Sequence, residues 1–191
     1  EYLENAFTYP VYIHLKGADL YAHKKTGKYN RNDFHANPQN KDCRYIDYVS
    51  HTDILINGIY WEKNMPRLFE MEDIKKGNFK LQTIADITDD LHGSVPCNLG
   101  DSSIANPVYG VDRNSFEKTA PYLPNSIDIM AVGNLPNELA RDASRYFGEQ
   151  LIKYVLDDIR KGNSRLIDRA TIVNAGKITS PYEYMKPYAG L

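Results

Sequence analysis

Two apolar runs in the chain each lead into polar residues and a glycine. Residues 54–58 read Ile-Leu-Ile-Asn-Gly, and residues 81–93 run from Leu81 through three carboxylates to His92 and Gly93. Short apolar runs of this kind are typical of buried strands, and ligands of an open α/β sheet bind outside the carboxyl ends of its strands. The two runs therefore predict a sheet with a ligand-binding edge.

The same pattern predicts further elements in the first two thirds of the chain. Residues 17–43 are polar and rich in Asn and Gly, which favours a long loop that includes one helical turn. Short helices are expected at 45–49 and at 70–76, the second stopped by Gly77. Strands separated by short helical segments indicate a parallel sheet built of βαβ units. The expected strands cover residues 11–15, 54–60, 81–87, 108–111 and 127–132.

The last third of the chain has a helical pattern. Apolar positions recur every three or four residues from Leu139 to Ile159, behind Pro136, a residue suited to a first helical turn. Gly162 is well placed to end this helix. A shorter helix is expected at 164–170 and a hairpin at 171–179. Residues 180–183, Ser-Pro-Tyr-Glu, match a capping box and predict a final helix.

Composition narrows the function classes. The chain has 191 residues, of which 42% are hydrophobic and 25% charged, as in globular domains. A net charge of −2 gives no basic footprint for nucleic acid. No apolar run approaches the roughly 18 residues of a membrane span. The first residues lack a signal-peptide pattern, and two cysteines are too few for a disulfide framework, so we expect a cytoplasmic protein without nucleic-acid or membrane partners.

The spacing of the glycines indicates whether the chain contains a complete dinucleotide-binding domain. A complete dinucleotide-binding domain begins with a glycine-rich turn, which lets the backbone approach a pyrophosphate. The closest glycines here, Gly93 and Gly100, lie seven positions apart. We therefore expect a fragment, or one segment of a discontinuous domain.

Other chemistry at the second apolar run is disfavoured. Asp86, Asp89, Asp90 and His92 contain metal-ligating groups, but alternation along a strand would send these side chains apart. Cys97 with His92 suggests a nucleophile pair, yet nothing supplies an orienting group. Asp86 is expected to be structural, because strand-end aspartates often accept from nearby backbone N–H groups.

Three ordered segments resemble a known family. They are residues 54–61 with 66–68, residues 84–90 with 93–95, and residues 131–136 with a following Glu-Leu, Arg, Ala-Ser and Tyr-Phe up to position 147. In this order and spacing they resemble the lysine–2-oxoglutarate reductase and lysine-forming saccharopine dehydrogenase family, which is related to alanine dehydrogenase and the transhydrogenase α subunit. The resemblance covers the C-terminal half of that fold.

The resemblance implies an α/β fold, in which the second half of a Rossmann-like parallel sheet is followed by C-terminal helices that return to a substrate domain. Residues 1–135 would form the later half of an NAD(P)-binding domain, and residues 136–191 a helical segment of the substrate, or catalytic, domain. The family's catalytic lysine and histidine precede this chain, so we assign no catalytic residue and no metal ligand. The cofactor, NAD or NADP, would be bound by Asn57, Gly58, Ile59, Asp90, Asn134 and Leu135.

The implied activity is hydride transfer at a C–N bond, forming or cleaving saccharopine from lysine and 2-oxoglutarate. An alanine dehydrogenase-like or opine-type enzyme, or a non-catalytic half-fold binding module, are the alternatives. Gly133, where the lysine-pathway members often have aspartate, and Ala140, where proline is common, depart from the family pattern. Expected partners are an amino acid, a 2-oxo acid and the missing N-terminal half, without which this chain would be inactive; homo-oligomer formation is left open.

Overall fold

The computed structural model describes residues 9–162 and 164–190. It divides the chain into two compact units, Glu1–Leu135 and Pro136–Leu191. The first unit contains a five-stranded sheet and the second is mainly helical. Among the described residues, no helix is long and apolar enough to cross a membrane.

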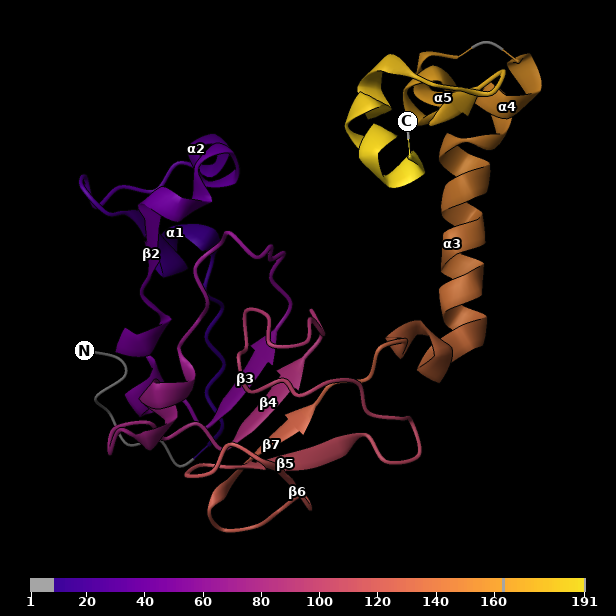
Figure 1. Ribbon diagram of the computed structural model, residues 1–191. Helices are drawn as coiled ribbons and strands as arrows, with labels where there is room; N and C mark the ends of the chain where they lie inside the picture. The colour runs from indigo at the N-terminus through magenta and orange to yellow at the C-terminus, as the bar shows by residue number, and fades with distance from the viewer. Residues whose placement is uncertain (1–8, 163, 191) are drawn as a thin grey trace. The chain divides into compact units, whose positions relative to one another are not determined.

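A five-stranded sheet in the order β3-β4-β7-β5-β6 forms the centre of the first unit. Three of its strands are parallel and point to one edge (Figure 1): β3 (Ile54–Asn57), β4 (Thr83–Asp86) and β7 (Ser126–Met130). The other two, β5 (Val108–Asp112) and β6 (Lys118–Thr119), form an antiparallel hairpin whose first strand pairs with β7. The predicted α/β class is confirmed, but the connection from β4 to β7 carries this hairpin instead of a helix.

The two faces of the parallel strands differ. On one face, here called the covered face, Ile84, Ile127 and Ile129 are fully buried and pack against Leu81 and Val95. Burying each such side chain contributes about 1.5–3 kcal/mol. The opposite face, here called the open face, carries the alternate residues of the same strands: Ile54, Ile56, Thr83, Ala85, Asp128 and Met130.

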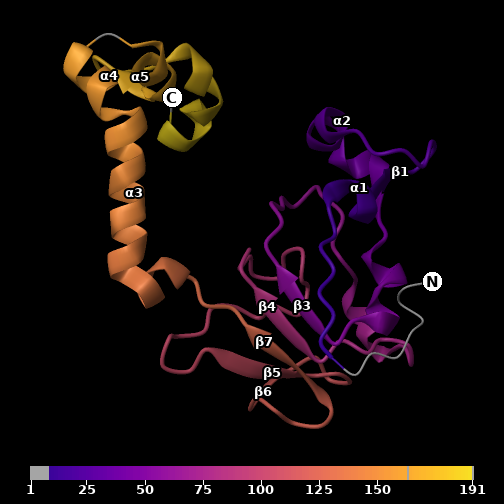
Figure 2. The ribbon, with the colours of Figure 1, turned by 180° about the vertical axis from the view of Figure 1, so that it is seen from behind.

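The amino-terminal part of the first unit departs most from expectation. Residues 11–15 form no strand; they run beside β3 without a ladder partner among the described residues (Figure 2). The predicted long loop 17–43 contains two α-helices, α1 (Gly17–Leu20) and α2 (Arg31–Ala36), and a short antiparallel ladder of β1 (Tyr21–His23) with β2 (Lys41–Cys43). These elements were missed because they are short, and because buried Lys41, which pairs with Asp33, breaks the apolar pattern.

Three other strands of this unit lie near their predicted positions but are shorter, whereas β5 covers all of the strand predicted at 108–111. The strands predicted at 54–60, 81–87 and 127–132 end at Asn57, Asp86 and Met130, where side-chain hydrogen bonds and loops take over. The helices predicted at 45–49 and 70–76 are 3-10 turns. These turns are η3 (Tyr45–Asp47) and η4 (Val49–His51) for the first helix and η5 (Met71–Lys75) for the second, while a further 3-10 turn, η2 (Pro38–Asn40), precedes β2.

The second unit begins with the turn η6 (Leu135–Leu139) and the helix α3 (Ala140–Tyr154). The single helix predicted up to residue 161 is interrupted at Val155, whose φ of −124° is not helical, and resumes as α4 (Leu156–Lys161). Gly162 caps α4 in the left-handed conformation, as its position predicts.

The end of the second unit is largely as predicted. Ser164 caps α5 (Arg165–Ala170), and β8 (Val173–Asn174) pairs with β9 (Lys177–Ile178) as the expected hairpin. The last element, η7 (Ser180–Ala189), is a 3-10 helix, and the predicted capping box is wrong. Thr179 is the N-cap residue and makes no side-chain capping bond, so Ser180 lies inside the first turn.

Candidate functional site

The candidate site is the edge of the sheet where β3, β4 and β7 end. Because the three strands are parallel, Asn57, Asp86 and Met130 stand at one edge, and the loops that follow them share it (Figure 1). Ligands of open α/β sheets bind at such an edge. The sequence-predicted cofactor residues all follow, or end, one of these strands.

A buried network of amides and one carboxylate holds this edge together. The side-chain nitrogen of Asn57 donates to Asp86 Oδ1 at 2.8 Å and to Ser94 Oγ at 2.9 Å. Asn98 Nδ2 donates to Asp86 Oδ2 at 2.9 Å. All four residues are buried. Both carboxylate oxygens of Asp86 are thus engaged in the framework, but their short bonds come from side-chain amides, whereas backbone N–H donors were predicted; the one backbone donor among the described residues is the Asp89 N–H at 3.4 Å.

The loop after β3 and the loop after β4 are bonded to each other. The Ile87 N–H donates to the Asn57 carbonyl at 2.8 Å, and the Thr88 hydroxyl donates to the Ile59 carbonyl at 2.6 Å. Two strand-end loops therefore form one continuous surface. Within it Gly58 is exposed, and the space where its Cβ would lie is empty.

The loop after β4 has a backbone that restricts its residues. Asp89 and His92 have φ values of 54° and 50°, in the left-handed region. A Cβ added to Gly93 would lie 2.5 Å from Asp90 Cβ and 2.8 Å from the Asp90 carbonyl oxygen, so this position requires glycine. The turn leaves the Asp90 side chain exposed at the edge of the sheet.

Two carboxylates lie close to the loop that follows β7. A Cβ on Gly133 would lie 2.9 Å from Asp101 Oδ2 and 3.2 Å from Asp89 Oδ2. Desolvation raises the pKa of Asp89; the bond from Asn98 opposes this, while the charges of Asp101 and other nearby carboxylates add to it. Desolvation, followed by the charge of Asp86, also raises the pKa of Asp90. An edge of this charge favours ligand hydroxyls, amides or cations over phosphates.

The six predicted cofactor residues have different environments. Asn57 uses its side-chain amide inside the buried network, while Gly58 and Asp90 are exposed. Asn134 is exposed in the loop after β7, and Leu135, at the start of η6, is half-buried. Ile59 packs against the core. The structure brings the strand-end loops to one edge, and contact of these residues with a cofactor stays a prediction.

The alternative chemistries have no support at this edge. Among the residues described, no group of three or more His, Cys, Asp or Glu side chains is arranged to hold a metal ion. Burial raises the pKa of the Cys97 thiol to about 12, so this thiol stays protonated and is a poor nucleophile. His92 Nδ1 lies 3.1 Å from the Pro96 carbonyl oxygen and makes no pair with Cys97.

Three residues of this edge were not singled out by sequence reasoning. Asn98 and Tyr109 extend the network: the Tyr109 hydroxyl donates to Asn98 Oδ1 at 3.3 Å and accepts from the Leu99 N–H at 2.8 Å. Asp101 covers Gly133. The sequence carried one signal for Asp101. Gly133 stands where the family members often have aspartate, and the missing carboxylate leaves room for the carboxylate of Asp101. Asn98 lies in an irregular loop and has no periodic signal.

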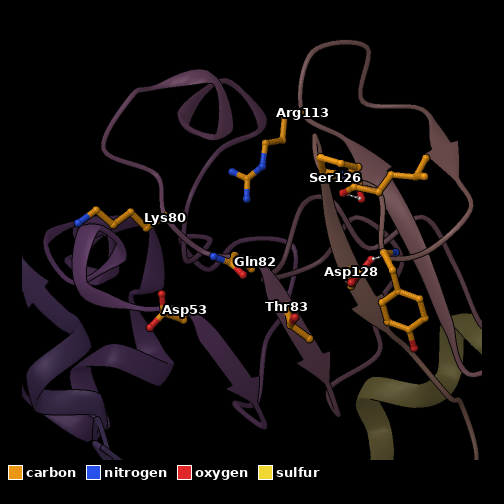
Figure 3. A pocket seen from close by; sticks show the side chains of 10 residues that line it. Asp53, Lys80, Gln82, Thr83, Arg113, Ser126 and Asp128 are labelled. Atoms are coloured by element: carbon orange, nitrogen blue, oxygen red, sulfur yellow. Dashed lines mark hydrogen bonds between the residues drawn. The ribbon is translucent and has the colours of Figure 1, made fainter. Parts of the chain in front are cut away.

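A pocket lies at the opposite edge of the sheet, where the parallel strands begin (Figure 3). It has a volume of about 570 Å³, and Asp53, Lys80, Arg113 and Asp128 line it. Two of its charged side chains bind the backbone of the fold: Arg113 donates to the carbonyls of Phe79 and Leu81, and Asp128 Oδ1 accepts from the Tyr122 N–H at 2.8 Å. None of the predicted cofactor residues reaches this pocket.

Comparison with known proteins identifies relatives of the chain. It is 30% identical over 181 residues to an alpha-aminoadipic semialdehyde synthase of Arabidopsis thaliana, a match that covers 90% of this chain and 17% of the relative. The mitochondrial alpha-aminoadipic semialdehyde synthase of Mus musculus is 27% identical, over 85% of this chain and 20% of the relative. A lysine-forming, NAD(+) saccharopine dehydrogenase of Schizosaccharomyces pombe is 25% identical over 112 residues, or 56% of this chain and 28% of the relative.

The chain thus spans between about a sixth and about a quarter of the length of these relatives. No protein-family model matches it. These relatives confirm the resemblance of the three ordered segments to the saccharopine dehydrogenase family.

Proposed function

We propose that this chain, a homologue of the alpha-aminoadipic semialdehyde synthases and lysine-forming saccharopine dehydrogenases, is the C-terminal portion of an NAD(P)-dependent oxidoreductase that acts on a C–N bond. The reaction is the formation or cleavage of saccharopine, with lysine and 2-oxoglutarate as the other partners. The observation that carries the proposal is the relationship to the Arabidopsis protein, which extends over 90% of the chain. Its partner is the amino-terminal portion of the same protein, which supplies the acid and base. Because the mouse relative is mitochondrial, the cytoplasmic location expected from the sequence stays a prediction.

The residues at the carboxyl edge fit the nicotinamide end of a dinucleotide. Asp90 offers an exposed carboxylate that accepts from ribose hydroxyls, and Asn134 an exposed amide that matches a carboxamide. Gly58 leaves open space on the loop after β3, so a ring can approach the backbone there. The dinucleotide supplies the hydride chemistry when bound.

The acidic character of the edge supports the same division of labour. Asp89, Asp90 and Asp101, when ionised, would repel a pyrophosphate, so the proposal places the phosphate groups of the dinucleotide away from this edge. Asn57, with its side chain bonded to Asp86 and Ser94, positions the loop that carries Gly58 and Ile59. Leu135 and Asn134 follow β7 and close the other side of the edge.

The test uses the intact gene product. Oxidation of NADH and NADPH is followed with lysine plus 2-oxoglutarate, and with pyruvate plus ammonia, and products are identified by mass spectrometry. Saccharopine is the expected product. Alanine would move the protein to the related alanine dehydrogenase branch, and dinucleotide binding without turnover of either pair would overturn the substrate assignment.

The Asp90→Ala variant tests the site. Loss of one hydrogen bond to a charged group costs about 1.5–3 kcal/mol, so kcat/KM should fall roughly 10- to 100-fold while the melting temperature is unchanged. Asp42→Ala, which removes an exposed carboxylate from β2, is the matched control. Unchanged kinetics in Asp90→Ala would remove Asp90 from the site.

A further inference from the structure

The pocket at the start of the parallel strands contains opposite charges that do not pair. Asp53 and Asp128 line it together with Lys80 and Arg113, and the two cationic side chains lie above the two carboxylates in the view of Figure 3. Within the part of the chain that the structure describes, neither carboxylate forms an ion pair with either cation. A ligand that carries both charges would satisfy both kinds of group at once.

Arg113 presents a fixed guanidinium to this pocket. Its side chain is half-buried and donates to the carbonyl oxygen of Phe79 at 3.1 Å and to the carbonyl oxygen of Leu81. Desolvation lowers the pKa of Arg113, and no carboxylate among the described residues pairs with it. Because a guanidinium has more N–H donors than these two bonds use, it can still bind a carboxylate of a ligand.

The two carboxylates of the pocket have oxygens available to a donor. Asp128 is half-buried, and its Oδ1 accepts from the Tyr122 N–H at 2.8 Å, while its Oδ2 has no partner among the described residues. Asp53 is exposed, and its carboxylate is likewise unpaired within the described part of the chain. Thr83, which is opposite Asp128 in the pairing of β4 with β7, adds a hydroxyl. An ammonium group, which has three donors and no acceptor, suits this set of oxygens.

One side of the pocket is uncharged. Tyr122, Leu123 and Pro124 line it, and Tyr122 and Leu123 are exposed. A ligand with an apolar group would cover these side chains, and removing apolar surface from water is favourable. The volume of about 570 Å³ lies within the range of roughly 300–1,000 Å³ that is usual for small-molecule sites.

We infer that this pocket binds a free α-amino acid with an apolar side chain. The carboxylate of the amino acid lies against Arg113 and Lys80. Its ammonium group lies against Asp53 and Asp128, and its side chain packs on the uncharged side of the pocket. The four charged side chains of the pocket sum to zero, and a zwitterion preserves that balance.

The inferred site is separate from the candidate cofactor site. The strands β3, β4 and β7 have four or five residues each, so the two edges of the sheet are roughly 13–17 Å apart. None of the six predicted cofactor residues lines the pocket. The amino acid is therefore an additional ligand and not a reactant. The inference goes beyond the proposed function and does not depend on the reaction catalysed.

Titration calorimetry of the intact gene product with L-leucine tests the inference. Two analogues each lack one charged group: 4-methylpentanoate has no amino group, and 3-methylbutylamine has no carboxylate. L-leucine should bind saturably, and each analogue should bind at least ~10-fold more weakly, because it loses its charge-assisted hydrogen bonds. Glycine, which lacks the apolar side chain, should also bind more weakly than L-leucine.

The Asp128→Asn variant locates the binding in the pocket. Asparagine keeps an oxygen that can accept from the Tyr122 N–H, so the protein should remain folded, while the lost charge should weaken L-leucine binding roughly 10-fold. Asp53→Asn and Lys80→Gln change exposed side chains that are unpaired among the described residues. Each should weaken binding about 3-fold, as expected for an exposed charge, and leave the melting temperature unchanged.

Matched controls change the same residue types outside the pocket. Asp42→Asn and Lys25→Gln alter exposed residues that do not line it, and both should leave L-leucine binding unchanged. Asp90→Ala, at the carboxyl edge of the sheet, should also leave L-leucine binding unchanged, which separates the two sites.

Each contrary result overturns the inference. Absence of saturable L-leucine binding means that the pocket holds no amino acid, and equal binding of either analogue means that the site does not recognise a zwitterion. Binding that is lost in Asp90→Ala and kept in Asp128→Asn places the amino acid at the carboxyl edge. The assay with lysine and 2-oxoglutarate is scored separately. Saccharopine formation without L-leucine binding therefore rejects the amino-acid site and retains the proposed function, and the reverse result does the opposite.

Discussion

Alternate residues of β3, β4 and β7 form the covered face and the open face of the sheet. The two faces have different environments. On the covered face Ile84, Ile127 and Ile129 are completely buried, while on the open face Ile54 and Ile56 are mostly exposed. On β3 the open face carries isoleucine, the same residue type that is buried on the covered face of β4 and β7. The difference in the burial of these isoleucines therefore comes from the neighbours that each face has among the described residues.

The largest expected effect separates the two faces directly. Ile129→Ala removes buried methyl groups from the covered face and should lower the free energy of unfolding by about 2–5 kcal/mol. Met130→Ala, one position along on the open face, is the matched comparison and should cost clearly less. Urea unfolding of the two variants measures both values, and equal losses would mean that the faces are equally packed.

The second effect lies at the end of β3. Asn57→Ala removes the buried amide that donates to Asp86 Oδ1 and Ser94 Oγ, which costs about 1–3 kcal/mol. Ile56→Ala changes the neighbouring, exposed residue and should cost less than ~1 kcal/mol in the chain alone. Thermal unfolding distinguishes the two, and a larger loss in Ile56→Ala would contradict the assignment of the open face.

The smallest expected effect is electrostatic. It concerns Asp89, which lies in the loop after β4 at the carboxyl edge of the sheet. Because the folded-state pKa of Asp89 is raised, its charged form is disfavoured by folding, and stability falls as pH rises from its ordinary value through the folded pKa. Asp89→Asn should therefore stabilise the chain at pH 7, by less than ~1 kcal/mol. The gain should vanish at pH 3, where Asp89 is protonated in both states; melting temperatures at the two pH values test this, and a gain that persists at pH 3 would assign it to packing.

The two faces also explain which strands could be predicted. Residues 126–130 and 11–15 have comparable apolar patterns, but the first segment lies between β4 and β5 and is a strand, while the second has no ladder partner in the part of the chain that the structure describes. A periodic pattern predicts the tendency to form a strand, whereas the strand itself requires a neighbour to accept its hydrogen bonds. The prediction for 11–15 is wrong for this chain for that reason.

The candidate site was predictable to the extent that it depends on strand ends. Asn57, Asp86 and the loop before Asn134 reach one edge because β3, β4 and β7 are parallel, and alternation within the strands was visible in the sequence. The positions of Asn98 and Asp101 depend on a long irregular loop that folds back on β4 and β7. No periodicity describes such a loop, so the role of Asn98 was not predictable, and the departure from the family pattern at Gly133 was the one signal for Asp101.

The buried thiol of Cys97 has a practical consequence for all of these measurements. This side chain has no exposed surface and a pKa raised by burial to about 12, so a thiol reagent reaches it only when the core opens. Cys43, with a pKa raised to about 11 and partial exposure, lies outside the sheet in β2. The labelling rate of Cys97, with Cys43 replaced by Ser, therefore acts as a clock for opening of the sheet core, and it needs no introduced probe.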